Sequence, residues 1–289
     1  MNSSTPRKLW ATLEPIHSMI YFVPEALATW SEMGFTHPRM GYFAQRSAAM
    51  GAVEASVVSA TFYNFNPATV ERFIPAAWDI APPADIIEHR YRAADQALRR
   101  LLGGAVDSAE MEWAAETALT AAEGCRPDGR PLFAGHAGVA APDQPHLRLW
   151  HAATLLREFR GDGHVIALTA AGVSGLEAVV SYSATGDLFD EDFFRRSRGW
   201  SDQEWAAGED SLRERGWLDT EGGLTSAGRA ARDGIEQETD RLAAAPWQAL
   251  ESGAADRLAT TVGPWARLIL EADVLGGGGR NVRVLSDAV

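Results

Sequence analysis

Apolar residues recur at the three- and four-residue spacing of an amphipathic helix along much of the chain. The clearest run is 85–102, whose apolar face carries Ile86, Ile87, Tyr91, Ala94, Leu98 and Leu101. A shorter helix is expected over 25–33, because Pro24 suits the first turn of a helix. Further helices are expected over 110–123 and from His146 onward. The pattern therefore predicts a mainly α-helical fold.

A stretch rich in glycine and proline, 125–145, interrupts these helices. Such density of glycine and proline is typical of a linker between domains. It predicts an N-terminal helical half over 1–124 and a C-terminal half over 146–275. The last residues, 276–289, open with a run of glycines and are expected to form a flexible tail.

The segment 191–242 carries the most specific local pattern. Ser201 followed by Glu204 forms a capping box at the start of a helix. Two very short strands around a tight turn are expected over 217–225, and a long helix over 226–243. Helix, turn, helix, small hairpin and long helix is the order of a winged helix–turn–helix. We therefore expect a mainly α fold with small β-hairpins.

Two stretches of the chain, 51–102 and 172–218, resemble each other. The first has EASVVS before Trp78 and DQALRRLL after it; the second has EAVVS before Trp200 and DSLRERGWL after it. A duplication would make both halves degenerate winged-helix modules related by pseudo-symmetry, and the alternative is chance similarity. In a duplicated fold, the seam between the halves is the natural place for a pocket.

Composition and charge narrow the classes of function. The 289 residues are 46% hydrophobic and 22% charged, as in an ordinary globular protein with a core. The net charge of -13 repels phosphate and weighs against nucleic-acid binding. The single cysteine, Cys125, excludes an intramolecular disulfide and a cysteine-rich zinc site. The apolar stretch 16–23 is too short to span a bilayer, so we expect a cytoplasmic protein without a membrane partner.

The helix that begins after Ser201 corresponds to the DNA-reading helix of a winged helix, but its charge does not suit that task. Its first turns carry Asp202, Glu204, Glu209 and Asp210. A regulator would have to gather the nearby arginines on one face, within one chain or across a homodimer; these are Arg195, Arg196, Arg198, Arg213 and Arg215. We therefore favour a winged helix that serves as a packing scaffold.

Three polar residues near the N-terminus fall at helical spacing. Glu14, His17 and Tyr21 share one face if this segment is helical. A Glu-x-x-His pair binds iron in helical bundles when it occurs twice, and no second copy is present, so we predict no metal site. The remaining alternatives are a buried, hydrogen-bonded histidine and a pocket histidine that acts as acid–base group with Tyr21.

Aromatic and polar residues are mixed in two further runs, MGYFAQR and TFYNF. The candidate ligand contacts in them are Tyr42, Arg46, Tyr63 and Asn64, and Glu14 could join them. Rings with a few polar groups suit a small-molecule pocket, and an ordinary core with a buried amide is an equal alternative.

The segment 149–164 carries many polar residues for a buried helix, and we expect them to form a structural ion network. They are His151, Arg157, Glu158, Arg160, Asp162 and His164.

Several motifs with known chemistry are missing from the sequence. It has no G-x-G-x-x-G after a strand, no P-loop, no G-x-S-x-G and no H-E-x-x-H. Nothing here supports a nucleotide cofactor or a serine-hydrolase triad, and the sequence names no other cofactor.

The runs LEPIHSMIYF, MGYFAQR, TFYNF, GRPLFAGHA, LWHAATLLREFRGDGH, RGWSDQEW and LTSAGR resemble one family. It is the SalK-like actinobacterial helix–turn–helix family, whose members occur in and near antibiotic gene clusters. The run from GWSDQEW to LTSAGRA is also similar to the winged helix of MarR-type regulators. These resemblances imply a helix–turn–helix fold and a role in specialised metabolism, although a fold does not fix a function. We expect a small-molecule-binding protein, which could be an enzyme, with a ligand-responsive transcription regulator as the alternative.

Overall fold

The computed structural model describes residues 5–186 and 191–275. Within these residues the helices are α1 (Thr5–Ser18), α2 (Pro24–Glu32), α3 (Pro38–Ser47), α4 (Ala55–Phe62), α5 (Pro67–Glu71), α6 (Ala76–Ile80), α7 (Pro83–Leu102), α8 (Ala109–Glu123), α9 (Pro131–Ala137), α10 (Pro145–Ala170), α11 (Gly175–Ser183), α12 (Glu191–Arg198), α13 (Asp202–Glu214), α14 (Ser226–Leu242), α15 (Ala245–Gln248) and α16 (Ala254–Glu271). Three 3-10 segments join them: η1 (Met19–Tyr21), η2 (Ala48–Met50) and η3 (Gly103–Asp107).

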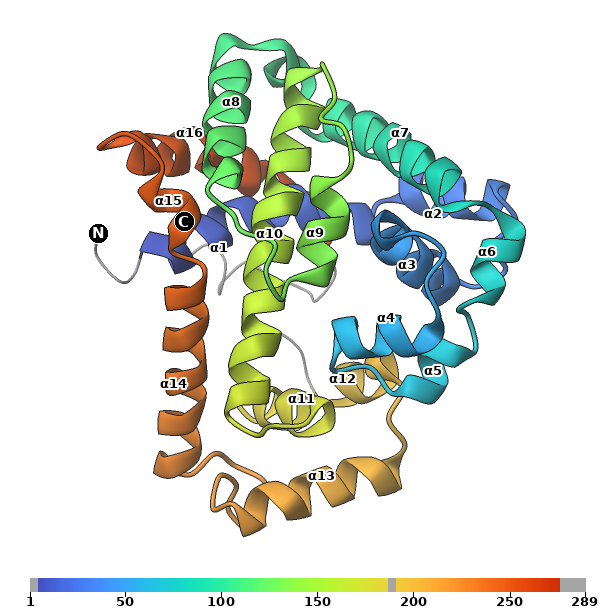
Figure 1. Ribbon diagram of the computed structural model, residues 1–289, viewed down its shortest axis with the longest axis vertical. Helices are drawn as coiled ribbons and strands as arrows, with labels where there is room; N and C mark the ends of the chain where they lie inside the picture. The colour runs from blue at the N-terminus through green and yellow to red at the C-terminus, as the bar shows by residue number, and fades with distance from the viewer. Residues whose placement is uncertain (1–4, 187–190, 276–289) are drawn as a thin grey trace.

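The long helix α10 runs through the middle of the molecule (Figure 1). It packs against α8, α14, α1 and α9, so its buried positions are spread around its circumference and not along one stripe. Polar residues such as His151, Glu158 and Asp162 are buried among them. Helix α10 therefore carries charged side chains into the interior, where each of them needs a partner.

The helices expected from the apolar pattern are confirmed. Helices α2, α7, α8 and α10 cover the four predicted runs, and α14 covers the predicted long helix near the C-terminus. Helices α2, α3, α7, α9 and α10 each begin on a proline, whose fixed φ suits a first turn and which needs no hydrogen bond there. Near the end of the described chain, α16 packs on α1, so both ends of the fold meet in one core.

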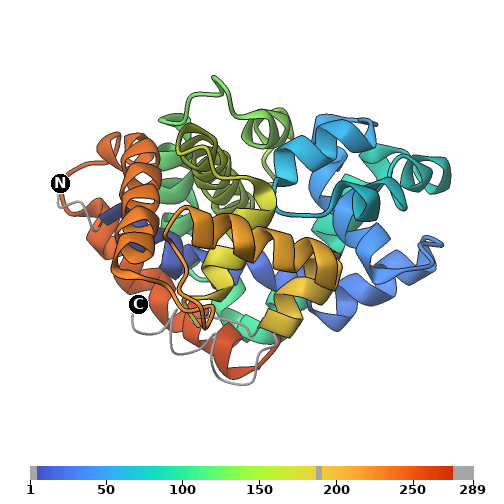
Figure 2. The same ribbon diagram turned by 90° about the horizontal axis from the view of Figure 1, so that it is seen from below.

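Helices α11 to α14 form a helix–turn–helix unit at one end of the molecule, with α13 on its outer side (Figures 1 and 2). The expected capping box of α13 is present: Ser201 Oγ accepts from Glu204 N, and the Glu204 side chain accepts from Ser201 N. A second box, Ser174 with Glu177, starts α11. A small core of its own holds the unit together, with Trp205 and Leu212 at its centre.

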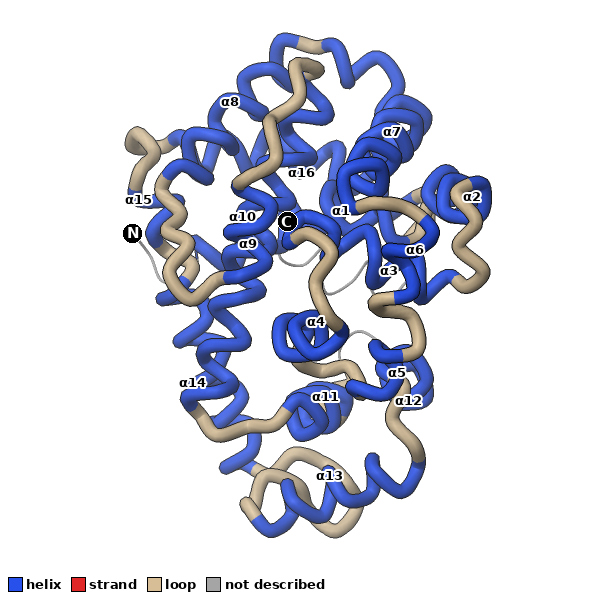
Figure 3. Tube along the Cα trace, turned by 45° about the vertical axis from the view of Figure 1, so that its right-hand side comes forward, coloured by secondary structure: helices blue, strands red, loops and turns tan. Residues whose placement is uncertain are grey.

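The expectation of small β-hairpins is wrong. No strand is present in the part of the chain that the structure describes, as Figure 3 shows, and the predicted wing is a single bridge between Leu218 and Leu224. The reason lies in the turn. Two backbone bonds cross the segment, from Thr225 N to Trp217 O and from Asp219 N to Gly223 O, both at 2.9 Å. Asp219 Oδ1 also accepts from the backbone N–H of Glu221 and Gly223, and Thr225 caps the next helix, so the pairing ends after a single bridge.

The expected pair of winged-helix modules is therefore also wrong. In the earlier stretch, α4 to α7 are followed by η3 and α8, with no bridge between them. The fold is all-α, and only the later stretch has the order of a helix–turn–helix unit.

The structure adds one fact about membranes. In residues 5–186 and 191–275 no single helix is both long and apolar enough to cross a bilayer; α10 and α11 reach that length and composition only as a pair bent by 102°. The predicted tail, 276–289, lies outside the described residues.

Candidate functional site

Glu158 of α10 is the centre of a buried group of charged and aromatic side chains. Its carboxylate is fully buried and is held by two guanidiniums. Arg46 Nε and Nη2 donate to the two oxygens at 3.0 and 2.9 Å, and Arg157 Nη1 donates to both at 3.0 and 2.9 Å. We call this group the polar cluster; its members are Glu14, His17, Tyr21, Tyr42, Arg46, Arg157 and Glu158.

The pairing decides the protonation of the central carboxyl. Burial alone would raise the pKa of Glu158, but the charges of Arg157 and Arg46 outweigh it and hold this pKa well below its usual value. Burial likewise opposes the charge of Arg46, and Glu158 holds the Arg46 pKa well above its usual value. The three groups therefore stay ionised, with two positive charges and one negative charge.

His17 lies at the base of the polar cluster, in the last turn of α1. Its Nδ1 and Thr154 Oγ1 are 3.0 Å apart, and its Nε2 and Tyr21 Oη are 3.0 Å apart. Burial and then the charge of Arg157 lower the His17 pKa well below its usual value, so the ring is neutral at pH 7. Burial raises the pKa of Tyr21 to about 12. Thr154 Oγ1 donates to the backbone oxygen of Trp150 at 2.9 Å, so Nδ1 donates to Thr154 and Nε2 accepts from Tyr21. Tyr21, His17 and Thr154 thus form one neutral hydrogen-bonded chain.

Helix α3 supplies the opposite side of the polar cluster. The rings of Tyr42 and Tyr21 are 5.2 Å apart between centroids. The Arg46 guanidinium lies 4.4 Å from the centroid of the Phe62 ring, and its Nη1 donates to Tyr42 Oη at 3.4 Å. Aromatic faces of this kind suit both a cation and the flat part of an organic molecule.

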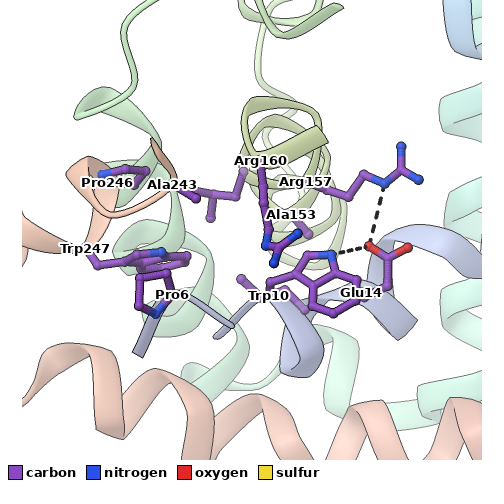
Figure 4. Close-up of a pocket in the computed structure, with 11 residues that line it drawn as sticks. Pro6, Trp10, Glu14, Ala153, Arg157, Arg160, Ala243, Pro246 and Trp247 are labelled. Atoms are coloured by element: carbon purple, nitrogen blue, oxygen red, sulfur yellow. Dashed lines mark hydrogen bonds and ion pairs between the residues drawn. The ribbon is translucent and has the colours of Figure 1, made fainter. Parts of the chain in front are cut away.

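Glu14 extends the polar cluster along α1, as Figure 4 shows. Trp10 Nε1 donates to Glu14 Oε2 at 3.1 Å, and Arg157 Nε lies 3.6 Å from the same oxygen. Burial raises the pKa of Glu14, and Arg157 opposes that rise. The cavity drawn in Figure 4 has a volume of about 10 Å³, roughly the space that one water molecule needs, so it is too small for an organic ligand.

One side of the polar cluster is buried and the other side is accessible to solvent. Glu158 is fully buried, whereas the side chains of Glu14 and Arg157 keep 14% and 24% of their surface exposed. Near the same part of α10, an open groove of about 470 Å³ runs over α4 and α9, and Asp162 lines it one turn beyond Glu158. Burial raises the pKa of Asp162 to about 6. This groove has the size of a small-molecule site, and it lies beside the polar cluster without being lined by any of its members.

Two of the predicted ligand contacts lie elsewhere. Tyr63 follows α4 and donates from its hydroxyl to the carbonyl oxygen of Val173, and Asn64 accepts at its backbone oxygen from Trp200 Nε1 at 3.0 Å. Both residues hold the helix–turn–helix unit against α4. The structure thus brings together Glu14, His17, Tyr21, Tyr42 and Arg46 and does not bring Tyr63 and Asn64 to them.

The central residues of the polar cluster, Arg157 and Glu158, were expected only as part of an ion network. Ion pairs confirm that network for Arg157, Glu158, Arg160 and His164. Among the described residues His151 and Asp162 form no ion pair: His151 bonds to Tyr91, and Asp162 accepts from the backbone N–H of Phe133. Arg160, another member of that network, joins α10 to α14, where it pairs with Glu236 and Asp240. The local sequence does not distinguish Glu158 from its charged neighbours on α10. Its ion-pair partner Arg46 lies 112 positions away in the chain, so no local spacing indicates the pair.

The described residues contain no group of three or more His, Cys, Asp or Glu side chains able to hold a metal ion. The one carboxylate at the centre, Glu158, is already saturated by Arg46 and Arg157.

The arginines of the helix–turn–helix unit are engaged with carboxylates of the same unit. Arg195 pairs with Glu191 and Asp202; the remaining pairs are Arg196 with Asp192, Arg213 with Glu209 and Asp210, and Arg215 with Glu177. Arg198 turns inward and lies 4.5 Å from the centroid of the Phe65 ring. The residues exposed along α13 include Asp202, Asp210 and Glu214. The charge on this outer face is therefore mainly negative.

Comparison with known proteins gives one match. Residues 6–276 match a helix–turn–helix family. No curated protein and no solved structure matches the chain. Since the match covers nearly the whole sequence and the structure contains a helix–turn–helix unit, the chain belongs to this helix–turn–helix family.

Proposed function

We propose that this protein binds a small organic molecule at the polar cluster and uses its helix–turn–helix unit as a structural support. The observation that carries the proposal is the gathering of Glu14, His17, Tyr21, Tyr42 and Arg46 around the Arg46–Glu158 pair. Buried ionic groups are costly, and a scaffold would be at least as stable with apolar residues of similar volume in their place. Their presence beside an accessible surface favours a binding role.

The chemistry open to this site is proton transfer. Both ring nitrogens of the fully buried His17 are engaged, so a ligand would exchange a proton with His17 through the hydroxyl of Tyr21, which is half-buried. Arg46 is poorly suited to anchor an anionic ligand, because Glu158 takes up two of its nitrogens. The resemblance to SalK-like proteins supports a ligand from specialised metabolism.

A thermal-shift screen with a panel of small aromatic and aliphatic compounds tests this proposal. We expect a subset to raise the Tm of the native chain and to lose this effect in His17→Gln and Tyr21→Phe. The matched control is His89→Gln, because His89 lies on α7, and its ring contacts only the backbone oxygen of Asp85 among the hydrogen bonds of the described residues. Equal shifts in His17→Gln and in the native chain would contradict the proposal.

A ligand-responsive, DNA-binding regulator is the second candidate, and membership in a helix–turn–helix family favours it. The ion pairs of the helix–turn–helix unit oppose DNA binding by this candidate regulator. To contact phosphate, Arg195, Arg213 and Arg215 would have to leave the carboxylates that hold them.

A further inference from the structure

Arg90 of α7 is a buried guanidinium that has no anionic partner within residues 5–186 and 191–275. It is 2% exposed, and its Nε and Nη2 find no hydrogen-bond partner among the described residues. Its guanidinium carbon lies 4.8 Å from the centroid of the Trp150 ring. A buried charged donor left unpaired costs more than almost any other polar group in a fold. Such a group points to a ligand that supplies the missing acceptor.

The surroundings of Arg90 contain donors and rings but no carboxylate bound to it. Its own helix offers only apolar residues one turn away on each side, such as Ile86 and Ala94. The facing residues of α10 are Trp150 and His151, and His151 Nδ1 lies 2.5 Å from Tyr91 Oη. Trp150 also contacts the polar cluster, because its Nε1 donates to the backbone oxygen of His17 at 3.3 Å.

His136 of α9 is a second buried side chain with an unused polar atom. It is 3% exposed, and its Nε2 finds no partner among the described residues. Burial lowers the His136 pKa to about 3, and the charge of Arg90 adds to this effect. His136 is therefore neutral and can offer one hydrogen bond but no charge. Helices α7 and α9, which carry Arg90 and His136, both pack on η2 and on α10, so the two side chains lie in one interior region. The charge of Arg90 also lowers the pKa of His151 and of His17.

We propose that Arg90 and His136 bind the carboxylate of a small organic acid. A carboxylate supplies the one negative charge that Arg90 lacks, whereas a phosphate dianion would lose more hydration free energy on burial. Two adjacent donors of a guanidinium also fit the two oxygens of a carboxylate. The inference rests on the proposed function and names the class of ligand.

The test compares matched acids and amides on the native chain. The probes are acetate with acetamide, benzoate with benzamide, and inorganic phosphate, and the readouts are the Tm and the Kd from calorimetry. We expect at least one acid to bind while its amide does not, and phosphate to bind more weakly than that acid. In Arg90→Met the acid should bind at least tenfold more weakly, in Arg90→Lys the loss should be smaller, and Arg92→Met, an exposed change on the same helix, should behave as the native chain.

A second readout separates a binding role from a structural one. Because Arg90→Met removes an unpaired buried charge, the free variant should unfold at the same or a higher urea concentration. Any of four results would overturn the inference. Three concern binding: equal affinity for acid and amide, tighter binding of phosphate than of the acid, and unchanged acid binding by Arg90→Met. The fourth is a large loss of stability in the free Arg90→Met variant. If only neutral compounds bind and do so through His17, the inference fails and the proposed function stands; if no compound binds, both fail.

Discussion

Arg46 and Glu158 meet in a two-pronged ion pair, with both nitrogen–oxygen distances between 2.9 and 3.0 Å, across helices that lie far apart in the sequence. Arg157, the residue beside Glu158 on α10, binds the same carboxylate from the other side. This arrangement fixes the polar cluster in place and leaves His17 and Tyr21 as its neutral, proton-carrying members.

Removal of the central negative charge should destabilise the fold strongly. Glu158→Gln leaves Arg46 buried without an anion and Arg157 with only Glu14 at 3.6 Å, and breaking a buried pair costs about 3–5 kcal/mol in comparable cases. Urea unfolding measures the change. Glu238→Gln is the control, because Glu238 pairs with Arg241 on the surface, and it should leave the midpoint unchanged. A midpoint for Glu158→Gln close to that of the native chain would show that the pair does not organise the interior.

The stability of the fold should fall as the pH drops from 7.5 to 5.5. Burial lowers the pKa of His17, of His136 to about 3, and of His151 and His164 to about 4. The unfolded chain binds protons on these rings near pH 6.5 and the folded chain does not, so each ring reduces the unfolding free energy by about 1.4 kcal/mol per pH unit below that value.

Two buried carboxyls work in the opposite direction, because burial raises the pKa of Glu14 as well as that of Asp162. The folded-state pKa of Asp162 is raised to about 6, so the folded chain gains a proton there first and regains stability as the pH falls below that value. Urea unfolding at pH 7.5, 6.5 and 5.5 should still show a net decline, and His136→Gln should reduce the slope by one proton. A slope that is unchanged in this variant would mean that His136 titrates normally in the folded chain.

The contact between α4 and the helix–turn–helix unit should tolerate no extra atom. A Cβ at Gly175 would overlap the backbone oxygen of Tyr63, so Gly175→Ala should destabilise by about 3 kcal/mol, the upper end for overpacking. Gly234→Ala is the matched change: this glycine lies exposed in α14 with no atom near, and alanine should stabilise the helix by about 1 kcal/mol. Equal effects of the two changes would contradict the close approach at Gly175.

Double-stranded DNA should bind the chain weakly or not at all. Because Arg195 and Arg213 are held by carboxylates and α13 exposes acids, few phosphate contacts are available. A mobility-shift assay against DNA from upstream of the coding sequence, at micromolar protein and two salt concentrations, measures this. A sequence-selective, salt-sensitive shift would instead support the regulator.

Much of the helical framework could be predicted from the sequence, because it depends on local signals. Proline at helix starts, the capping box at Ser201 and the apolar spacing over 85–102 each act within one or two turns. The prediction of a wing was wrong for a reason that is also local. The segment 217–225 has the apolar ends of a hairpin, but Asp219 closes the turn and Thr225 caps the next helix, and no strand forms.

The site was harder to predict, since its contacts join distant segments. The spacing of Glu14, His17 and Tyr21 did indicate one face, and the structure brings these three residues to one cluster. Tyr63 and Asn64 have the same residue chemistry as Tyr42, but a positive φ at Tyr63 turns the chain toward the helix–turn–helix unit. Nothing in the local sequence around Arg90 signals that it lacks a partner.

Ligand binding that depends on His17 is the central claim, and calorimetric titration of one screened compound into the native chain, His17→Gln and His89→Gln tests it most directly. We predict the same Kd for the native chain and His89→Gln, and at least tenfold weaker binding by His17→Gln, with similar urea midpoints for all three proteins. Equal affinity in all three proteins would contradict the account.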